Sequence, residues 1–238
     1  MTAPHDIFSM KLLYVILQFH KSKVAGELST FKEFLYDVNN LANSEKKKLD
    51  QMLDEMVKKN PADEQEIYEH FSDQYDVYRS KYVELANNGS LVNAYSFFEF
   101  QLKDIVRTLD RFVVNKKGTN RHRKRLSYAE NLRNDIIAIT GLNFSSLRPL
   151  WTNLDKYRKI RNVIVHNGAN LFEEEGKALV DQKSYRVVSS FTEININGSN
   201  GDFYIIDKSL VAKYLDLVEE YLSKLIDILK TLDKADIR

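Results

Sequence analysis

An arginine, an asparagine and a histidine stand within six residues of one another in the segment WTNLDKYRKIRNVIVHNG, residues 151–168. Asn162 follows Arg161 directly, and four residues separate Arg161 from His166. A guanidinium group can hold a phosphate through two parallel hydrogen bonds and stabilise the negative charge that develops on it. An imidazole can take up or release a proton near neutral pH. These side chains therefore favour chemistry at a phosphate group, provided that the chain brings them together.

The residues around this trio predict an amphipathic helix that ends close to His166. Pro149 suits a first helical turn because its φ is fixed and it lacks an N–H. Asn167 and Gly168 are typical of a helix C-terminus. Between these points, apolar residues recur at three- and four-residue spacing, which predicts one buried face: Trp151, Leu154, Tyr157, Ile160 and Ile164.

The spacing alone does not bring Arg161 and His166 together. Five residues correspond to about 140° of rotation in an ideal helix, so the two side chains do not share one face. They converge only if the helix end unwinds or if a second copy of the chain supplies one of them. The spacing also fits two ordinary features, a solvated arginine and a histidine that the helix dipole favours in a last turn.

The string RNVIVHNGAN, residues 161–170, resembles the motif of the HEPN superfamily. That motif is an arginine followed, after four to six residues, by a histidine, often with a polar residue directly after the arginine. Arg161, Asn162 and His166 match it. Residues 93–112 also resemble the long helix that precedes the motif in these domains, with Glu99 as its internal acidic residue. The resemblance covers about residues 91–168.

This resemblance implies metal-independent cleavage of RNA by a homodimer, in which paired helices bring two copies of the motif into one cleft. Arg161 and His166 would be catalytic, Asn162 would orient one of them or the RNA, and Glu99 and Asn167 would be auxiliary. The expected products are a 2′,3′-cyclic phosphate and a 5′-hydroxyl, with no metal and no other cofactor.

The resemblance also implies a biological role and an alternative to it. The role is that of a toxin or effector in bacterial defence or in a toxin–antitoxin system, with an antitoxin or defence protein as partner. A related system neutralises such toxins by modifying a tyrosine two residues beyond the histidine, but this chain has Gly168 there. The alternative is a non-catalytic module of the HEPN fold that binds RNA or protein. A helical DNA-binding regulator is disfavoured because no short helix-turn-helix with a basic recognition helix stands out.

A second candidate for RNA contact is the segment KKGTNRHRKR, residues 116–125. A basic loop of this density can neutralise several phosphates and bind with salt-dependent, sequence-tolerant affinity. A solvated loop with no ligand explains the same composition. The candidate RNA-binding residues are Lys116, Lys117, Arg121, Arg123, Lys124 and Arg125.

The composition of the chain limits the other functions that it could have. The formal net charge of +1 does not indicate a nucleic-acid partner, so an RNA-binding surface must be local. With no cysteine, disulfides, thiolate catalysis and cysteine-based metal sites are excluded. The apolar run 7–19 is too short to span a membrane and has no lysine or arginine before it, so we expect a core helix and a cytoplasmic protein. The acidic residues between positions 63 and 76 are expected to form the solvated face of a helix rather than a metal site.

The apolar pattern predicts an all-α, HEPN-like helical bundle with a small β-hairpin inserted before the C-terminal helix. We expect a single domain made of N-terminal helices (1–88), a motif-bearing core (89–168), the hairpin (184–206) and the C-terminal helix (207–238). Tyr185, Val187 and Val188 are expected in extended chain, and residues 197–201 in the turn of the hairpin.

Several helix ends can be predicted from local chemistry. We expect a break near Gly26, a new helix capped at Asn43-Ser44, and a helix end at Asn60-Pro61. A helix over 62–86 is expected to end in a turn at 87–89, with Ser90 capping the next helix. Ser127 and Glu130 form a capping box for a helix that ends at Gly141.

Overall fold

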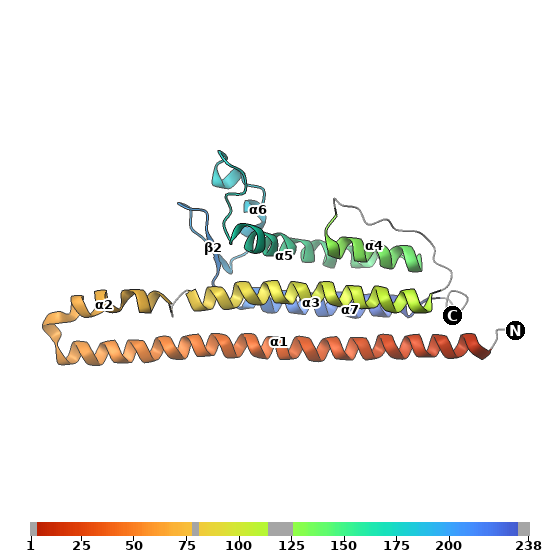
Figure 1. Cartoon of the computed structure of the whole chain (residues 1–238), viewed down its shortest axis with the longest axis horizontal. Helices are drawn as coiled ribbons and strands as arrows, with labels where there is room; N and C mark the ends of the chain where they lie inside the picture. Colours follow the sequence, from red (N-terminus) through yellow and green to blue (C-terminus); the bar gives the residue numbers. More distant parts are fainter. Residues whose placement is uncertain (1–3, 78–80, 114–125, 233–238) are drawn as a thin grey trace. The chain divides into compact units, whose positions relative to one another are not determined.

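The computed structural model describes residues 4–77, 81–113 and 126–232. This part of the chain is predominantly helical, which confirms the expected all-α class, and it holds one sheet of two strands. The elements, drawn in Figure 1, are α1 (Pro4–Lys59), η1 (Pro61–Asp63), α2 (Glu64–Asp76), α3 (Tyr82–Phe112), α4 (Tyr128–Thr140), η3 (Ser145–Leu147), α5 (Arg148–Asn167), η4 (Leu179–Asp181), α6 (Tyr185–Val188), β1 (Ile194–Ile196), β2 (Phe203–Ile205) and α7 (Ser209–Leu229). No helix of the described residues is both long and apolar enough to cross a lipid bilayer.

The chain divides into two compact units. Unit 1 comprises residues 1–29, 93–157 and 214–238, and unit 2 comprises residues 30–92 and 158–213. The helices α1, α3, α5 and α7 each contribute residues to both units. The motif residues 161–166 belong to unit 2.

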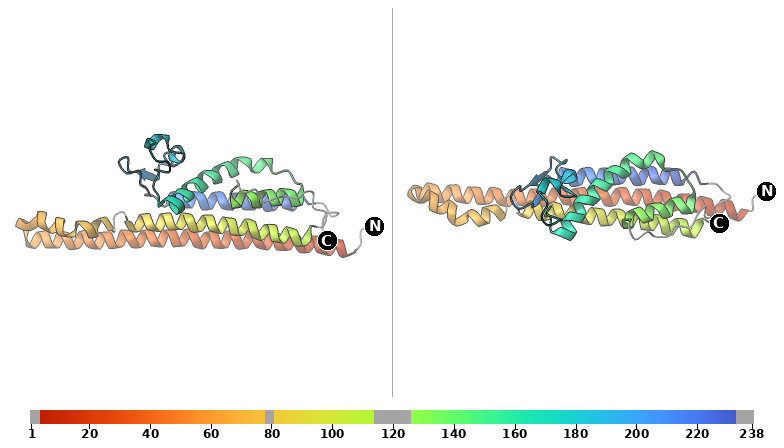
Figure 2. Two further views of the ribbon diagram at one scale, coloured as in Figure 1. Left: turned by 45° about the horizontal axis from the view of Figure 1, so that its top comes forward. Right: turned by 90° about the horizontal axis from the view of Figure 1, so that it is seen from above.

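Unit 1 is built around an aromatic core on α3, α5 and α7. In both Figures 1 and 2, the unit 1 parts of α1, α3 and α7 run side by side. The ring of Phe98 lies 5.7 Å from that of Tyr221 and 6.3 Å from that of Trp151, and all three pack at an angle. Apolar residues of α3 recur at three- and four-residue spacing, and this face is buried at Tyr95, Phe98, Leu102, Ile105 and Leu109. These contacts fix the start of the motif helix α5.

Unit 2 joins the second part of α1 to α2, α3 and the hairpin. Near its end, α1 packs against α2 through Leu49, Leu53 and Ile67. Earlier on α1, the buried side chain of Asn39 donates to Asn87 Oδ1 on α3 (3.4 Å). Asn87 Nδ2 in turn donates to the carbonyl oxygen of Ile205 on β2 (3.0 Å). Two buried amides thus connect α1 and α3 with β2.

The hairpin is present but shorter than expected. β1 and β2 are antiparallel, with Ile194 opposite Ile205, and residues 197–201 make the turn between them. Residues 185–188 form the short helix α6, so the prediction of extended chain there was wrong. The β-branched residues favour a strand. Local bonds override that preference, since the backbone N–H of Val188 donates to the carbonyl oxygen of Ser184 (3.0 Å).

The helix α1 is continuous through Gly26, where a break was predicted, and through Asn43-Ser44, where a new helix was predicted to begin. A helical glycine costs about 1 kcal/mol relative to alanine. The neighbouring Val24 and Leu28 are buried, and burial of each such side chain contributes about 1.5–3 kcal/mol, which outweighs that cost. The predicted end before Asn60-Pro61 is confirmed, because α1 stops at Lys59.

The predicted turn at residues 87–89 was also wrong. α3 begins at Tyr82 and runs through these residues without a turn. Asn and Gly favour turns when they are solvated. Here Asn87 is fully buried and bonded to β2, so tertiary contacts keep it in a helix.

The predicted N-cap of α4 at Ser127 is confirmed. Ser127 Oγ accepts the backbone N–H of Glu130 at 3.2 Å, and Gly141 ends α4 in the left-handed conformation with φ of 65°. Both features depend only on neighbours in sequence, which is why the sequence predicts them correctly.

Candidate functional site

Arg161, Asn162 and His166 lie in the last two turns of α5. The helix ends at Asn167, and the two residues that follow, Gly168 and Ala169, have φ of 61° and 62°. The N–H of Ala169 turns back to the carbonyl oxygen of Val163 at 3.2 Å, which closes the helix end. The predicted helix and its end are therefore confirmed.

Arg161 is half-buried and is held by its neighbour. Its Nη1 donates to Asn162 Oδ1 at 3.1 Å, and its Nε lies below the surface. A guanidinium presents its donors in a rigid fork, so fixing one nitrogen restricts where the others point. Asn162 is thus placed to orient Arg161, which is one of the roles considered for it.

His166 is exposed, and the helix does not unwind before it. Because α5 stays helical to Asn167, Arg161 and His166 keep the offset of about 140° that five helical residues impose. A single copy of the chain therefore does not bring the two side chains to one face. For Arg161 and His166 to act on one group, a second copy of the chain must therefore supply one of them.

The side chain of Asn167 stabilises the chain at the end of α5. Its Nδ2 donates to the carbonyl oxygens of Asn170 and Phe172, so its side chain ties α5 to the chain that follows. Glu99 is half-buried on the unit 1 part of α3. The six basic candidates between residues 116 and 125 lie outside the described residues.

The chain after the motif is joined to the hairpin by hydrogen bonds. The N–H of Leu171 donates to the carbonyl oxygen of Gly201 (2.9 Å), and the N–H of Phe203 donates to that of Ala169 (2.9 Å). The side chain of Asn170 donates to the carbonyl oxygen of Asn200 (2.8 Å) and to Asp202 Oδ1 (2.7 Å). The hairpin therefore fixes residues 169–171, only a few positions beyond His166.

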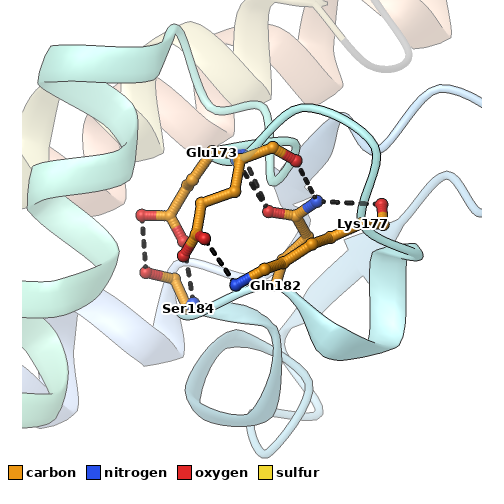
Figure 3. A network of polar contacts seen from close by, with 5 residues as sticks. Glu173, Lys177, Gln182 and Ser184 are labelled. Atoms are coloured by element: carbon orange, nitrogen blue, oxygen red, sulfur yellow. Dashed lines mark hydrogen bonds and ion pairs between the residues drawn. The ribbon is translucent and has the colours of Figure 1, made fainter.

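A polar network shapes the next part of the chain, as Figure 3 shows. The Gln182 side chain, 3% exposed, accepts the N–H groups of Glu173 and Glu174 and donates to the carbonyl oxygens of Glu174 and Lys177. The Glu173 carboxylate accepts both the N–H (2.8 Å) and the hydroxyl (3.0 Å) of Ser184. The periodicity of the sequence does not predict this network, because its partners lie up to eleven residues apart in irregular chain.

Two carboxylates lie close together beside the hairpin. Burial raises the pKa of Glu84 above its ordinary value, and the negative charge of Asp202 raises it further. Asp202 itself accepts hydrogen bonds from Asn170 and Asn200. Among the described residues, no group of three histidine, cysteine or acidic side chains could hold a metal ion.

Comparison with known proteins gives no relative of this chain. No family model, no curated protein and no solved structure matches it.

Proposed function

We propose that this chain is a metal-independent endoribonuclease of HEPN type, with the HEPN-like bundle as its fold. The observation that carries the proposal is the placement of Arg161, Asn162 and His166 at the very end of a packed helix, with Arg161 held by Asn162. The all-α architecture agrees with it. We further propose that the enzyme is the toxin or effector of a bacterial defence or toxin–antitoxin system, in the cytoplasm, with a protein partner that controls it.

The reaction is an internal transfer at phosphorus. The ribose 2′-oxygen forms a bond to phosphorus while the bond from phosphorus to the 5′-oxygen of the next nucleotide breaks. One proton leaves the 2′-hydroxyl and one reaches the departing 5′-oxygen. His166 transfers a proton, and Arg161 stabilises the charge of the five-coordinate phosphorus. The products are a 2′,3′-cyclic phosphate and a 5′-hydroxyl.

The active form is a homodimer. Arg161 and His166 of one copy point about 140° apart, so a cleft that uses both needs side chains from two copies. An isologous contact between the ends of the two α5 helices supplies them, because twofold symmetry places both copies of the motif at the same interface.

Incubation of the purified protein with transfer, messenger and ribosomal RNA in EDTA tests this proposal. We expect the wild-type protein to cleave RNA and to leave cyclic-phosphate ends, while Arg161→Ala and His166→Ala each lose cleavage by roughly 100-fold or more. The matched controls are Arg186→Ala and His70→Ala, which replace exposed residues outside the motif and should cleave normally. In cells, the two motif variants should also relieve growth arrest caused by the wild type.

A mixing experiment tests the shared cleft. Arg161→Ala and His166→Ala are combined under conditions in which subunits exchange. Cleavage should return, because a mixed dimer retains one intact arginine and one intact histidine. If wild type and both variants behave alike in every assay, the catalytic proposal fails, and the alternative of a non-catalytic RNA- or protein-binding module takes its place.

A further inference from the structure

Phe172 is an exposed aromatic residue six positions beyond His166. Its side chain is 43% exposed although it lies in a loop whose shape is fixed by hydrogen bonds. Its N–H donates to Asn170 Oδ1 (2.8 Å), and its carbonyl oxygen accepts Nδ2 of Asn167 (3.4 Å). Phe172 is therefore held on both sides of its backbone by asparagines that follow the motif directly.

One side of the Phe172 ring lies on the hairpin. A Cβ built on Gly201 would fall 2.6 Å from Cδ2 and 2.9 Å from Cε2 of Phe172, closer than two carbon atoms can approach. Gly201 also has φ of 75°, which favours glycine. The missing side chain at residue 201 leaves room for the ring edge at Cδ2 and Cε2, and 43% of Phe172 remains exposed.

Hydrogen bonds also hold the part of the loop that follows this ring. The chain that follows Phe172 is tied by the Gln182 amide, and Glu173 is bound to Ser184 (Figure 3). Of the acids after Phe172, Glu173 is engaged in this way and Glu174 forms an ion pair with Lys177. The ion pair with Lys177 offsets the charge of Glu174, whereas the hydrogen bonds from Ser184 fix the position of the Glu173 carboxylate without neutralising it.

We propose that Phe172 is a stacking platform for an unpaired base of the RNA that occupies the motif, an inference that rests on the proposed function. Every base has a π face, so stacking on a fixed aromatic ring is sequence-tolerant. A base within a duplex is already stacked on its neighbours, so the platform takes single-stranded RNA. Phe172 then sets how the strand lies relative to the scissile phosphate.

Binding is measured by fluorescence anisotropy of a short unpaired RNA on the His166→Ala protein, which does not depend on cleavage. Phe172→Ala should weaken binding by roughly 5- to 100-fold, the range of one base stack. Phe172→Trp should bind at least as well as Phe172. Phe172→Leu keeps apolar bulk against Gly201 but has no π face, and it should bind as weakly as the alanine variant.

The matched control is Val180→Ala. Val180 is 63% exposed in the same loop, so this change removes apolar surface without an aromatic ring. Its affinity should equal that of the parent. Gly201→Ala displaces the Phe172 ring and should lose affinity as Phe172→Ala does.

Abasic nucleotides then locate the stacked base. Replacing one nucleotide at a time by an abasic residue should weaken binding to the parent at one position, and that loss should vanish in Phe172→Ala. Coupling of this kind is expected of two groups in contact and not of a general loosening of the loop. Duplex RNA of the same sequence should show no difference between the two proteins.

The outcomes separate the two proposals. Normal cleavage by wild type with unchanged affinity in Phe172→Ala overturns the stacking platform and leaves the nuclease standing. Absence of cleavage, together with the aromatic dependence of affinity, overturns the nuclease and leaves an RNA-binding platform. Equal affinity of the leucine and tryptophan variants contradicts stacking, and absence of any RNA binding overturns both.

Discussion

His20 is a buried histidine in unit 1. Its Nδ1 lies 3.4 Å from Asp104 Oδ2, whereas its Nε2 is buried with no hydrogen-bond partner among the described residues. Burial lowers the pKa of His20 below its ordinary value of 6.5, and nearby Lys23 acts in the same direction. The carboxylates of Asp104 and Glu27 oppose this shift, with a smaller effect than burial.

The His20 pKa predicts a loss of stability in mild acid. Below pH 6.5 the unfolded chain binds a proton at this histidine more readily than the folded chain does, so the free energy of unfolding falls as the pH drops further. The slope is at most about 1.4 kcal/mol per pH unit for one proton. Urea unfolding at about pH 7.5 and about pH 5.5 measures it. The wild type should lose more stability than His20→Leu between these two conditions.

An exposed histidine provides the control for that experiment. His70→Leu replaces an exposed histidine and is the matched control. Equal pH dependence in His20→Leu and in the wild type would contradict the prediction. Lys21 lowers the pKa of Asp227 below its ordinary value of 3.8, so the contribution of this carboxylate is lost as the pH falls through that value, below this range.

At the scale of elements, the Asn39–Asn87 pair connects the helices of unit 2 to the hairpin. Both side chains are buried, and the carbonyl oxygen of Ile205 depends on Asn87 for the hydrogen bond at 3.0 Å. The hairpin in turn fixes the chain after α5 through Gly201 and Phe203. A polar contact of α3 therefore supports the region that follows the motif.

Asn87→Ala should lower the free energy of unfolding by about 1–3 kcal/mol, because it leaves buried polar groups without a partner. Urea denaturation gives that difference. Hydrogen exchange gives its location, since the N–H of Ile206, bonded to Glu193, should exchange faster. Asn40→Ala, at an exposed position next to Asn39 on α1, is the control and should change stability by less than about 0.5 kcal/mol. A neutral Asn87→Ala would show that the pair does not support the hairpin.

At the scale of the whole molecule, the proposed dimer predicts a mass in solution of twice 27.8 kDa. Light scattering on a sizing column measures it. Val165 is 45% exposed next to His166, so Val165→Glu should disrupt the contact between paired α5 ends and reduce both the mass and the cleavage. Val15→Glu, at an exposed position in unit 1, should change neither. A wild-type monomer that cleaves RNA would contradict the shared cleft.

The basic segment 116–125 predicts a salt-dependent contribution to RNA binding. The logarithm of the affinity for single-stranded RNA falls with the logarithm of the salt concentration, with a slope of about −0.7 for each phosphate neutralised. Replacing Arg121, Arg123, Lys124 and Arg125 by alanine should flatten that slope by about 0.7 for each phosphate that these side chains neutralise. The control removes four exposed lysines of α1, Lys47, Lys48, Lys58 and Lys59. An equal slope in the loop variant and the parent would identify the segment as a solvated loop.

The sequence alone determines the features that depend on neighbours along the chain. The N-cap at Ser127, the ends of α4 and α5, and the burial of Leu154, Tyr157 and Ile160 on α5 follow from local hydrogen bonding and from the helical period. The sequence alone also identifies the motif and predicts its position at the end of a helix. The angular offset of Arg161 and His166 also follows from the sequence once α5 is known to be helical.

The tertiary structure decides what depends on contacts distant in sequence. Gly26 and Asn87 carry helix-breaking signals, yet both lie within helices, because burial of their neighbours or a bond to β2 outweighs a local preference of about 1 kcal/mol. Phe172 contacts Gly201 of the hairpin turn, and the side chain of Gln182 forms four hydrogen bonds with Glu173, Glu174 and Lys177 in irregular chain. No periodicity connects such positions, so only the folded chain brings an aromatic ring and its support to the end of the motif helix.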